Sequence, residues 1–206
     1  MSNKKYKEAN ITISKVYTRS GDSGKTMLVG GKKLFKDDLR ICSYGEIDEL
    51  NSYIGACRES IKKNDCELSN DSKYRILEDL KRIQNELFNI GNMLATPSES
   101  VTNTMPRIEN RHVKVLEEDI DFYNKNLPNL NSFVLPGGSL QNSFLHIARS
   151  FCRKCERTVV KLYRLDNIDK LIIKYLNRLS DLLFVLSRWV NFAQSLNENL
   201  WEPNKR

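Results

Sequence analysis

The sequence lacks any long hydrophobic run, and none of its segments approaches the ~18 consecutive apolar residues that a membrane-spanning helix needs. Residues 1–10 are polar, and they contain neither the apolar core of a signal peptide nor the Arg-rich amphipathic pattern of a transit peptide. The five cysteines are odd in number, which in a chain without a signal peptide argues for a reducing compartment rather than a disulfide framework. We therefore expect a soluble, cytoplasmic protein, and the sequence leaves an organelle open.

Histidine is also scarce, which bears on metal sites. Glu109-x-x-His112 matches half of a di-iron site of the ferritin type, in which two helices each supply Glu-x-x-His. The other histidine, His146, has Ser143 rather than a carboxylate three residues before it. Because the second half-site is missing, the sequence predicts no metal site.

Two other reactive patterns are incomplete. Cys152-x-x-Cys155 lacks the second cysteine pair that a zinc site requires. Both sulfurs fall on an apolar helical stripe, so we expect them to pack as small hydrophobic groups. No Ser–His–Asp or Cys–His arrangement is evident, so the sequence predicts no covalent nucleophile in the protein.

A complete P-loop is absent as well. Gly24-Lys25-Thr26 would end a Walker A motif only if position 19 were glycine, but it is Arg19, and no βαβ pattern surrounds the segment. The segment 18–26 is nevertheless rich in glycine, hydroxyl and basic residues. This composition suits either a phosphate-binding nest of backbone amides or a plain glycine turn, and the residues alone leave both interpretations open.

The chain carries an excess of positive charge. Its formal net charge is +7 and its pI is near 9.1, which favours anionic partners such as nucleotides, nucleic acid or anionic membrane surfaces. Charge does not choose among these partners, and most lysines are scattered among acidic residues as on an ordinary solvated surface. The motifs must therefore decide the ligand.

Amphipathic helical patterns are abundant. Apolar residues recur at steps of three and four over about residues 43–63, 73–95, 108–126, 139–165 and 168–200. These segments predict an all-α fold, an antiparallel five-helix bundle of the ferritin-like kind with a glycine-rich N-terminal arm. We expect residues 1–14 to be a flexible arm, residues 15–200 one helical domain, and residues 201–206 a tail.

The segment 139–165 carries the strongest functional pattern. Ser139 is a candidate N-cap, and the apolar stripe behind it includes both cysteines of the Cys-x-x-Cys pair. A set of charged residues repeats at helical spacing on an adjoining side: Arg149, Arg153, Glu156 and Arg157. This set could hold an anion or another charged helix, and with the segment 18–26 it suggests triphosphate binding without a P-loop. Asp48 could pair with Arg149 inside the bundle or across a subunit boundary.

Six short motifs follow one another along the chain. They are Tyr17-Thr-Arg-Ser-Gly-Asp-Ser-Gly24, Lys36-Asp-Asp38, Tyr44-Gly-Glu-Ile-Asp48-Glu-Leu-Asn51, Phe133-Val-Leu-Pro-Gly-Gly138, His146-Ile-Ala-Arg149-Ser-Phe-Cys-Arg153-Lys-Cys-Glu156-Arg157 and Tyr175-Leu-Asn177-Arg-Leu-Ser-Asp181. In this order and spacing they resemble the PduO-type corrinoid adenosyltransferases, over about residues 15–192.

The resemblance implies an ATP:cob(I)alamin adenosyltransferase. In such an enzyme Co(I) of the reduced corrinoid attacks C5′ of ATP and triphosphate leaves, giving adenosylcobalamin. The resemblance also implies a homotrimer with active sites between subunits, and Mg²⁺ as an assisting ion. A corrinoid reductase and an adenosylcobalamin-dependent enzyme are candidate partners, whereas nucleic acid and membrane are not expected.

The resemblance assigns roles to individual residues. Those on the ATP-binding arm are Thr18, Arg19, Ser20, Gly21 and Lys36, and the second ATP-binding group is Arg153, Lys154, Cys155, Glu156, Arg157 and Asn177. Asp48 and Arg149 match an intersubunit ion pair. Phe133 matches the aromatic residue beneath the corrin ring, where it would exclude a lower axial ligand of cobalt. The expected catalytic residues are Arg153, Phe133, Asp48 and Arg149.

Some positions depart from residues that are common in the family. They are Arg19, Ser20, Ser23 and Lys154, and most of them keep the charge or the hydroxyl of the usual residue. We therefore expect an effect on affinity rather than on activity.

Two further interpretations stay open at this point. A basic helical module for RNA or a partner helix would bind with strong salt dependence and would ignore ATP. A bundle of the same family could instead have kept corrinoid binding and lost catalysis, although every catalytic position that can be matched holds a suitable residue. The sequence does not assign a pathway, a monovalent ion or a role for the loop 96–106.

Overall fold

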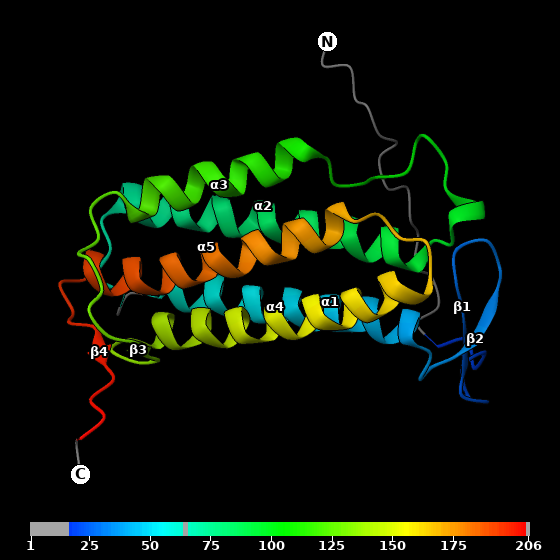
Figure 1. Ribbon diagram of the computed structural model, residues 1–206, viewed down its shortest axis with the longest axis horizontal. Coiled ribbons are helices and arrows are strands. Elements are labelled where there is room, and N and C mark those ends of the chain that lie inside the picture. Colours follow the sequence, from blue (N-terminus) through cyan, green and yellow to red (C-terminus); the bar gives the residue numbers. More distant parts are fainter. Residues whose placement is uncertain (1–16, 64–65, 205–206) are drawn as a thin grey trace.

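The computed structural model describes residues 17–63 and 66–204, which form a long helical bundle with two small β-structures (Figure 1). Its helices are α1 (Leu39–Lys62), α2 (Asn70–Ala95), α3 (Asn110–Asn124), α4 (Leu140–Leu165) and α5 (Leu171–Ala193), with a short 3-10 helix η1 (Ser98–Ser100). Its strands are β1 (Lys25–Met27), β2 (Lys33–Phe35), β3 (Val134–Leu135) and β4 (Asn199–Leu200). The predicted all-α bundle is confirmed. The expected arm over residues 1–14 lies outside the described residues.

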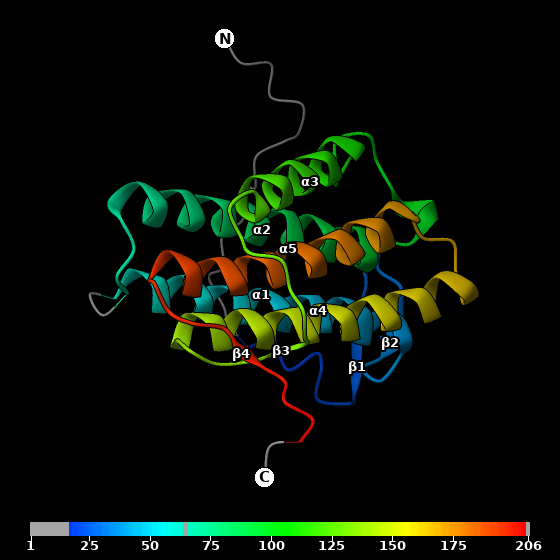
Figure 2. The same cartoon turned by 60° about the vertical axis from the view of Figure 1, so that its left-hand side comes forward.

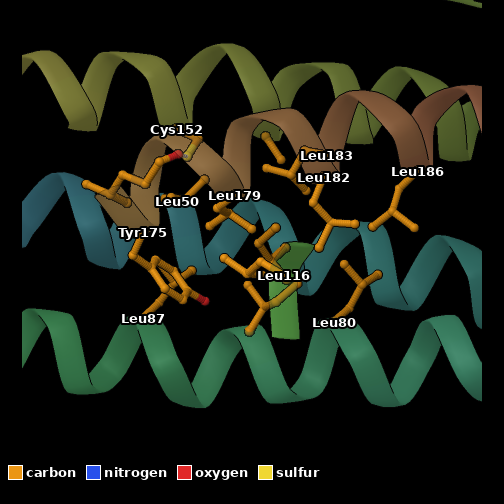
Figure 3. Packing of buried hydrophobic residues seen from close by; sticks show 14 of the residues in the cluster. Leu50, Leu80, Leu87, Leu116, Cys152, Tyr175, Leu179, Leu182, Leu183 and Leu186 are labelled. Carbon is orange, nitrogen blue, oxygen red and sulfur yellow. Dashed lines mark hydrogen bonds between the residues drawn. The ribbon is translucent and has the colours of Figure 1, made fainter. Parts of the chain in front are cut away.

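One continuous apolar core lies between the helices. Helix α4 packs against α1 and α5, while α2 packs on α1 and α3 packs on α5. Figure 3 shows leucines of several helices packed in one layer with Tyr175 and Cys152. Each fully buried leucine contributes on the order of 2 kcal/mol through the hydrophobic effect. Along the described part of the chain, no helix combines the length and apolarity that crossing a membrane requires.

The predicted helical stripes are confirmed as the buried faces. On α2 the buried apolar residues are Ile76, Leu80, Ile83, Leu87, Ile90 and Leu94, and on α5 they include Ile172, Leu176, Leu179, Leu183, Leu186 and Val190. Cys152 and Cys155 are fully buried, and the Cys152 thiol donates to the backbone oxygen of Leu176 at 3.3 Å. Burial raises the pKa of the Cys155 thiol to about 12, so these cysteines pack as apolar groups, as predicted.

Side-chain caps determine where α1 and α4 begin. The carboxylate of Asp38 accepts a hydrogen bond from the backbone N–H of Arg40 at 2.8 Å, so α1 begins ahead of the expected residue 43. The hydroxyl of Ser139 accepts from the backbone N–H of Asn142 at 3.1 Å. The predicted N-cap of α4 is therefore confirmed.

The Glu109-x-x-His112 pattern is a capping box at the start of α3. His112 Nδ1 accepts a hydrogen bond from the backbone N–H of Glu109 at 2.8 Å, and the Glu109 side chain accepts in return from the backbone of His112. Among residues 17–63 and 66–204, no group of three or more His, Cys, Asp and Glu side chains could hold a metal ion. The pattern therefore caps the start of a helix.

Helix α5 is shorter than expected. It was expected to reach residue 200, but it ends at Ala193, and the chain turns at Ser195, which has a φ of 57°. Beyond the turn, β4 pairs antiparallel with β3, so that Val134 faces Leu200 across the strand pair. The expected continuation of helix five to residue 200 is therefore wrong, because this segment finds a strand partner instead.

The hairpin of β1 and β2 lies at the end of the bundle where α1 begins and α4 ends (Figure 1). Its connection is docked on the end of α2, since the backbone N–H of Val29 donates to the backbone oxygen of Ala95 at 3.1 Å. Gly30 has a φ of 89°, and a Cβ there would lie 2.2 Å from the hydroxyl of Ser100. Glycine is therefore required for this docking.

A network of charged side chains joins α2, α3 and α5. The Arg82 guanidinium donates to the Glu86 carboxylate at 3.0 Å and to the Asp119 carboxylate. The Tyr175 hydroxyl, which is fully buried, donates to the second oxygen of Glu86 at 2.6 Å. Each charge of this network has a partner, so the network fixes how α3 sits on the rest of the bundle.

Candidate active site

The segment 17–24 forms a tight loop against the end of β2. The hydroxyls of Thr18 and Ser20 lie 2.7 Å apart, and the backbone N–H of Gly24 donates to the backbone oxygen of Gly21 at 3.1 Å. A Cβ at Gly21 would lie 3.1 Å from the Lys36 ammonium nitrogen. The structure thus brings Thr18, Ser20, Gly21 and Lys36 together, as two hydroxyls, a bare backbone and a cation.

Arg19 lies in the same loop but makes a different contact. It has a φ of 60°, which is unusual for a residue with a side chain, and its guanidinium carbon lies 5.8 Å from the ring centroid of Tyr17. Its side chain is exposed. Hydroxyls, cations and bare backbone in one exposed loop suit the phosphates of a nucleotide.

The second cluster lies where α4 faces α5. Asn177 of α5 donates from its amide to the Glu156 carboxylate of α4 at 3.3 Å. Arg153 and Arg157 follow on the same side of α4, one turn apart, and both are exposed. Neither arginine makes an ion pair with a residue of the described ranges. Two guanidiniums without a protein anion are suited to bind an anionic ligand.

Lys154 and Cys155 lie on another side of α4, against α1. The ammonium of Lys154 lies 3.4 Å from a carboxylate oxygen of Glu46 and 4.7 Å from the ring centroid of Phe151. The thiol of Cys155 donates to the backbone oxygen of Glu46 at 3.2 Å. The structure therefore separates these two residues from the Arg153 side of the helix. Glu46 was not among the residues predicted from the sequence, although it lies within the Tyr44–Asp48 motif.

Asp48 and Arg149 do not pair within the chain. Asp48 is exposed on α1, beside a groove of about 800 Å³ between α1 and α2 that is also lined by Tyr44 and Phe88. Within the described residues, no ion pair joins Asp48 to Arg149, and the buried Nε of Arg149 has no hydrogen-bond partner there. Burial, and then repulsion by Arg153, lowers the pKa of the Arg149 guanidinium. The alternative of an ion pair inside the bundle is therefore wrong.

His146 lies one turn before Arg149 and is buried. Its imidazole packs edge-to-face against Phe184 with 6.2 Å between ring centroids, and neither ring nitrogen has a partner among the described residues. Burial, and then repulsion by Arg149, lowers the pKa of His146 to about 4, although Glu198 acts in the opposite direction. The imidazole is therefore neutral at pH 7.

Phe133 stands exposed just before β3. Phe133 is 78% exposed, and its ring centroid lies 6.1 Å from that of the Trp201 ring. The backbone N–H of Trp201 donates to the Phe133 oxygen at 2.8 Å, and the Ser132 hydroxyl donates to the Trp201 oxygen at the same distance. The sequence interpretation missed Trp201, whose only local signal was a large aromatic side chain in a polar tail.

The predicted residues form separate groups in the chain. The loop 17–24 lies by the β1–β2 hairpin, at the opposite end of the bundle from β3, which Phe133 immediately precedes (Figure 1). In the turned view of Figure 2, α3 lies on the opposite face of the bundle from both strand pairs. Between these ends runs α4, whose 26 residues span about 40 Å at ~1.5 Å per residue. The described chain therefore does not bring the loop 17–24 and Phe133 together.

Comparison with known proteins shows the family to which the chain belongs. Residues 16–190 match the family model described as cobalamin adenosyltransferase. This chain belongs to the cobalamin adenosyltransferase family. The corrinoid adenosyltransferase of Mycobacterium leprae is 42% identical over 199 residues, which cover 94% of this chain and 98% of that protein. The corrinoid adenosyltransferase MMAB of Bos taurus is 35% identical and is matched over 93% of this chain and 78% of its own length.

Solved structures agree with this family assignment. A PduO-type ATP:corrinoid adenosyltransferase from Lactobacillus reuteri, with one phenylalanine replaced by alanine and complexed with cobalamin and ATP, superposes with a TM-score of 0.82. It is 34% identical and is matched over 91% of this chain and 99% of its own. The predicted resemblance is confirmed, and this member of the cobalamin adenosyltransferase family is a transferase enzyme.

Proposed function

We propose that this chain transfers the 5′-deoxyadenosyl group of ATP to Co(I) of a reduced corrinoid, giving adenosylcobalamin and triphosphate. A Co–C5′ bond forms with the electron pair of Co(I), while the C5′–O bond breaks and its electron pair leaves on the triphosphate. The observation that carries the proposal is the near-complete match to a transferase solved with both cobalamin and ATP. Since Co(I) of the corrinoid is the nucleophile, the protein does not need to supply one.

Arg153 and Arg157 act on the departing triphosphate in this proposal. Their guanidiniums have no anionic partner in the described chain, so they can neutralise charge that develops on the leaving group. Glu156 and Asn177, held together by their hydrogen bond, bind the nucleoside part of ATP or orient the arginines. Lys154 and Cys155 support this segment from the α1 side through Glu46.

The exposed loop binds the remaining phosphate oxygens. The residues proposed for this contact are Thr18, Arg19, Ser20, Gly21 and Lys36. Hydroxyl and ammonium donors fixed around a bare glycine hold the triphosphate in line for attack at C5′, which converts binding into correct orientation.

Phe133 serves the corrinoid. An exposed aromatic ring, braced at its edge by Trp201, offers an apolar surface to one face of the corrin ring. Such a surface keeps water and the corrinoid's own base away from cobalt. Co(II) can hold a lower axial ligand, whereas Co(I) does not hold one. Removing that ligand from Co(II) therefore makes Co(II) easier to reduce.

We propose that the complete site forms between copies of the chain in a homotrimer. Three observations support this: the loop and Phe133 lie at opposite ends of one bundle, Asp48 has an exposed carboxylate, and Arg149 has an unpartnered Nε. Asp48 of one copy would pair with Arg149 of another, and Phe88, which is 71% exposed beside the groove, would be covered there.

Magnesium fits this site only as part of the nucleotide. The described chain offers no cluster of carboxylates, cysteines or histidines for a resident ion. We infer that Mg²⁺ is held by the triphosphate oxygens, where it would offset their charge. A corrinoid reductase and an adenosylcobalamin-dependent enzyme are the proposed partners, and a cytoplasmic location stays a prediction.

The test is to mix the purified protein with chemically reduced cob(I)alamin and Mg-ATP under anaerobic conditions and to follow the visible spectrum. We expect conversion to adenosylcobalamin that stops when ATP is omitted. Binding of both ligands without conversion would indicate a bundle that has lost catalysis. Binding of neither ligand would favour the alternative interpretation, a basic helical module for RNA or a partner helix.

The shared site has its own test. Lys36→Ala disables the loop and Phe133→Ala removes the aromatic ring, and the proposal places these two parts of the site on different copies. If the copies are dissociated and reassembled as a mixture, some sites receive both intact groups and activity returns. A mixture as inactive as its components would contradict a site between copies.

A further inference from the structure

Arg188 is a buried guanidinium that the proposed mechanism does not use. It lies on the last part of α5 and is only 5% exposed. Its Nε donates to one carboxylate oxygen of Glu198 at 2.5 Å, and its Nη2 donates to the other at 3.2 Å. The same Nη2 donates to the backbone oxygen of Pro128 at 2.7 Å. One side chain thus ties α5 to two segments that are distant from each other in the sequence.

Both of these segments lead directly to Phe133. Pro128 belongs to the connection that runs from α3 to Phe133, and Glu198 is the residue immediately before β4. Strand β4 pairs with β3, which begins just after Phe133, and Trp201 donates its backbone N–H to the Phe133 oxygen. The guanidinium therefore holds two segments beside the exposed ring: the connection that precedes Phe133, and the segment that leads into β4.

The strands alone would hold this ring weakly. Each of them has two residues, and so short a pair is marginal in water without further support. The Arg188–Glu198 pair supplies directional support, because a planar guanidinium bound through two nitrogens fixes both distance and angle. A buried ion pair is a poor source of net stability compared with apolar packing, so its geometry is the more informative feature.

We infer that Arg188 and Glu198 are positioning residues for the corrinoid side of the site, which hold Phe133 in place through Pro128 and β4. The inference rests on the proposed function, since Phe133 is taken to exclude the lower ligand of cobalt. Neither residue needs to touch the corrinoid. A displaced ring excludes that ligand less completely, so the loss falls on the reduction of bound Co(II) and not on ATP binding.

The test compares Glu198→Gln and Glu198→Ala with the wild type, with Arg188→Lys as the conservative variant. Glu118→Ala is the matched control, because it removes a carboxylate from an exposed pair on α3. We expect Glu198→Gln to lower turnover from cob(II)alamin, with a chemical one-electron reductant supplied, on the order of 10-fold, with an unchanged KM for ATP. Turnover from pre-reduced cob(I)alamin should stay within about twofold of the wild type, since displacement of the ring matters less once Co(I) is formed.

The electron paramagnetic resonance spectrum of bound cob(II)alamin gives a second readout. The signal of Co(II) without a lower axial ligand should weaken in Glu198→Gln and in part in Arg188→Lys. In a Phe133→Ala background, Glu198→Gln should cause no further loss, because the ring through which it acts is gone. Thermal melting checks that each variant is folded. If Glu198→Ala does not fold, Glu198→Gln, which keeps the size of the side chain, carries the test alone.

Three results overturn the inference. The first is a turnover from cob(II)alamin in Glu198→Gln that equals that of the wild type, and the second is an unchanged Co(II) spectrum in that variant. The third is a loss of turnover on Glu198→Gln that is equally large in the wild-type and Phe133→Ala backgrounds. If instead the wild type forms no adenosylcobalamin from cob(I)alamin, it is the proposed function that fails.

Discussion

Arg82 and Arg153 belong to the same bundle, but their guanidiniums have opposite surroundings. Arg82 lies between Glu86 and Asp119, inside a network that joins three helices. Arg153 is exposed on α4, and no residue of the described ranges forms an ion pair with it. An arginine whose partners are built into the fold maintains the fold, whereas one without a partner can bind a ligand. The predictions below test this division.

The largest effect is expected for Arg82→Ala. The change leaves the buried Glu86 carboxylate without a cation and leaves Asp119 with only the longer contact to Arg75 at 3.8 Å, which should lower the free energy of unfolding by about 3 kcal/mol or more. Urea denaturation measures this. The control is Lys114→Ala, which breaks an exposed pair with Glu118 and should cost less than about 1 kcal/mol. A loss no larger than that of the control would contradict a structural role of Arg82.

Arg153→Ala should act in the opposite way. We expect kcat from cob(I)alamin to fall on the order of 100-fold, because one donor to the departing triphosphate is lost. The free energy of unfolding should change by less than about 0.5 kcal/mol, as is usual at an exposed position. Lys161→Ala, at another exposed position of α4, is the matched control and should keep wild-type turnover. Equal turnover in both variants would sink the role of Arg153.

His146 extends the comparison to a buried base that stays neutral. Its pKa in the folded state is about 4, below the ordinary value of 6.5, because of burial and of Arg149. Between these two pH values the unfolded chain therefore binds a proton at His146 and the folded chain does not. This difference lowers the free energy of unfolding as pH falls from 6.5 toward 4. Between pH 6.5 and pH 5 the loss should be about 2 kcal/mol.

Comparison with His146→Gln isolates this contribution from that of the carboxylates. The variant should lose less stability than the wild type over the same pH interval, as measured by urea denaturation at each pH. Parallel stability curves for the two proteins would show that His146 titrates normally.

The smallest effect is expected for Lys154→Ala. Lys154 pairs with Glu46 on the α1 side, and a half-exposed pair of this kind contributes little, so the KM for ATP should change less than about fivefold. Arg157→Ala, on the ligand side of the same helix, should raise that KM by about tenfold or more. If Lys154→Ala has the larger effect, the two sides of α4 have been assigned wrongly.

Periodicity was sufficient to predict the bundle. The stripes of α2 and α5 are buried because residues at steps of three and four share one face of a helix, and this rule depends on no distant partner. The end of α5 does depend on such partners, since residues beyond Ser195 leave the helix to pair with β3 and to bind Arg188. No proline or glycine marks that end in the sequence.

The site was predictable only in part, and for a similar reason. Motif resemblance named Arg153 and Lys154 together, but adjacent residues on a helix point about 100° apart, so their partners differ. The sequence also could not choose between an internal and an intersubunit pair for Asp48 and Arg149. The relative positions of α1 and α4 exclude the internal pair, because the two charges do not meet there, and the intersubunit pair stays a proposal.

The most direct test of the account is to quantify both products of the wild-type reaction with cob(I)alamin and Mg-ATP. Phosphorus NMR measures triphosphate, and the visible spectrum measures adenosylcobalamin. Attack at C5′ with an intact leaving group predicts one triphosphate for each adenosylcobalamin formed, and none when the corrinoid is omitted. Release of ADP or pyrophosphate in place of triphosphate, or no adenosylcobalamin at all, would contradict the account.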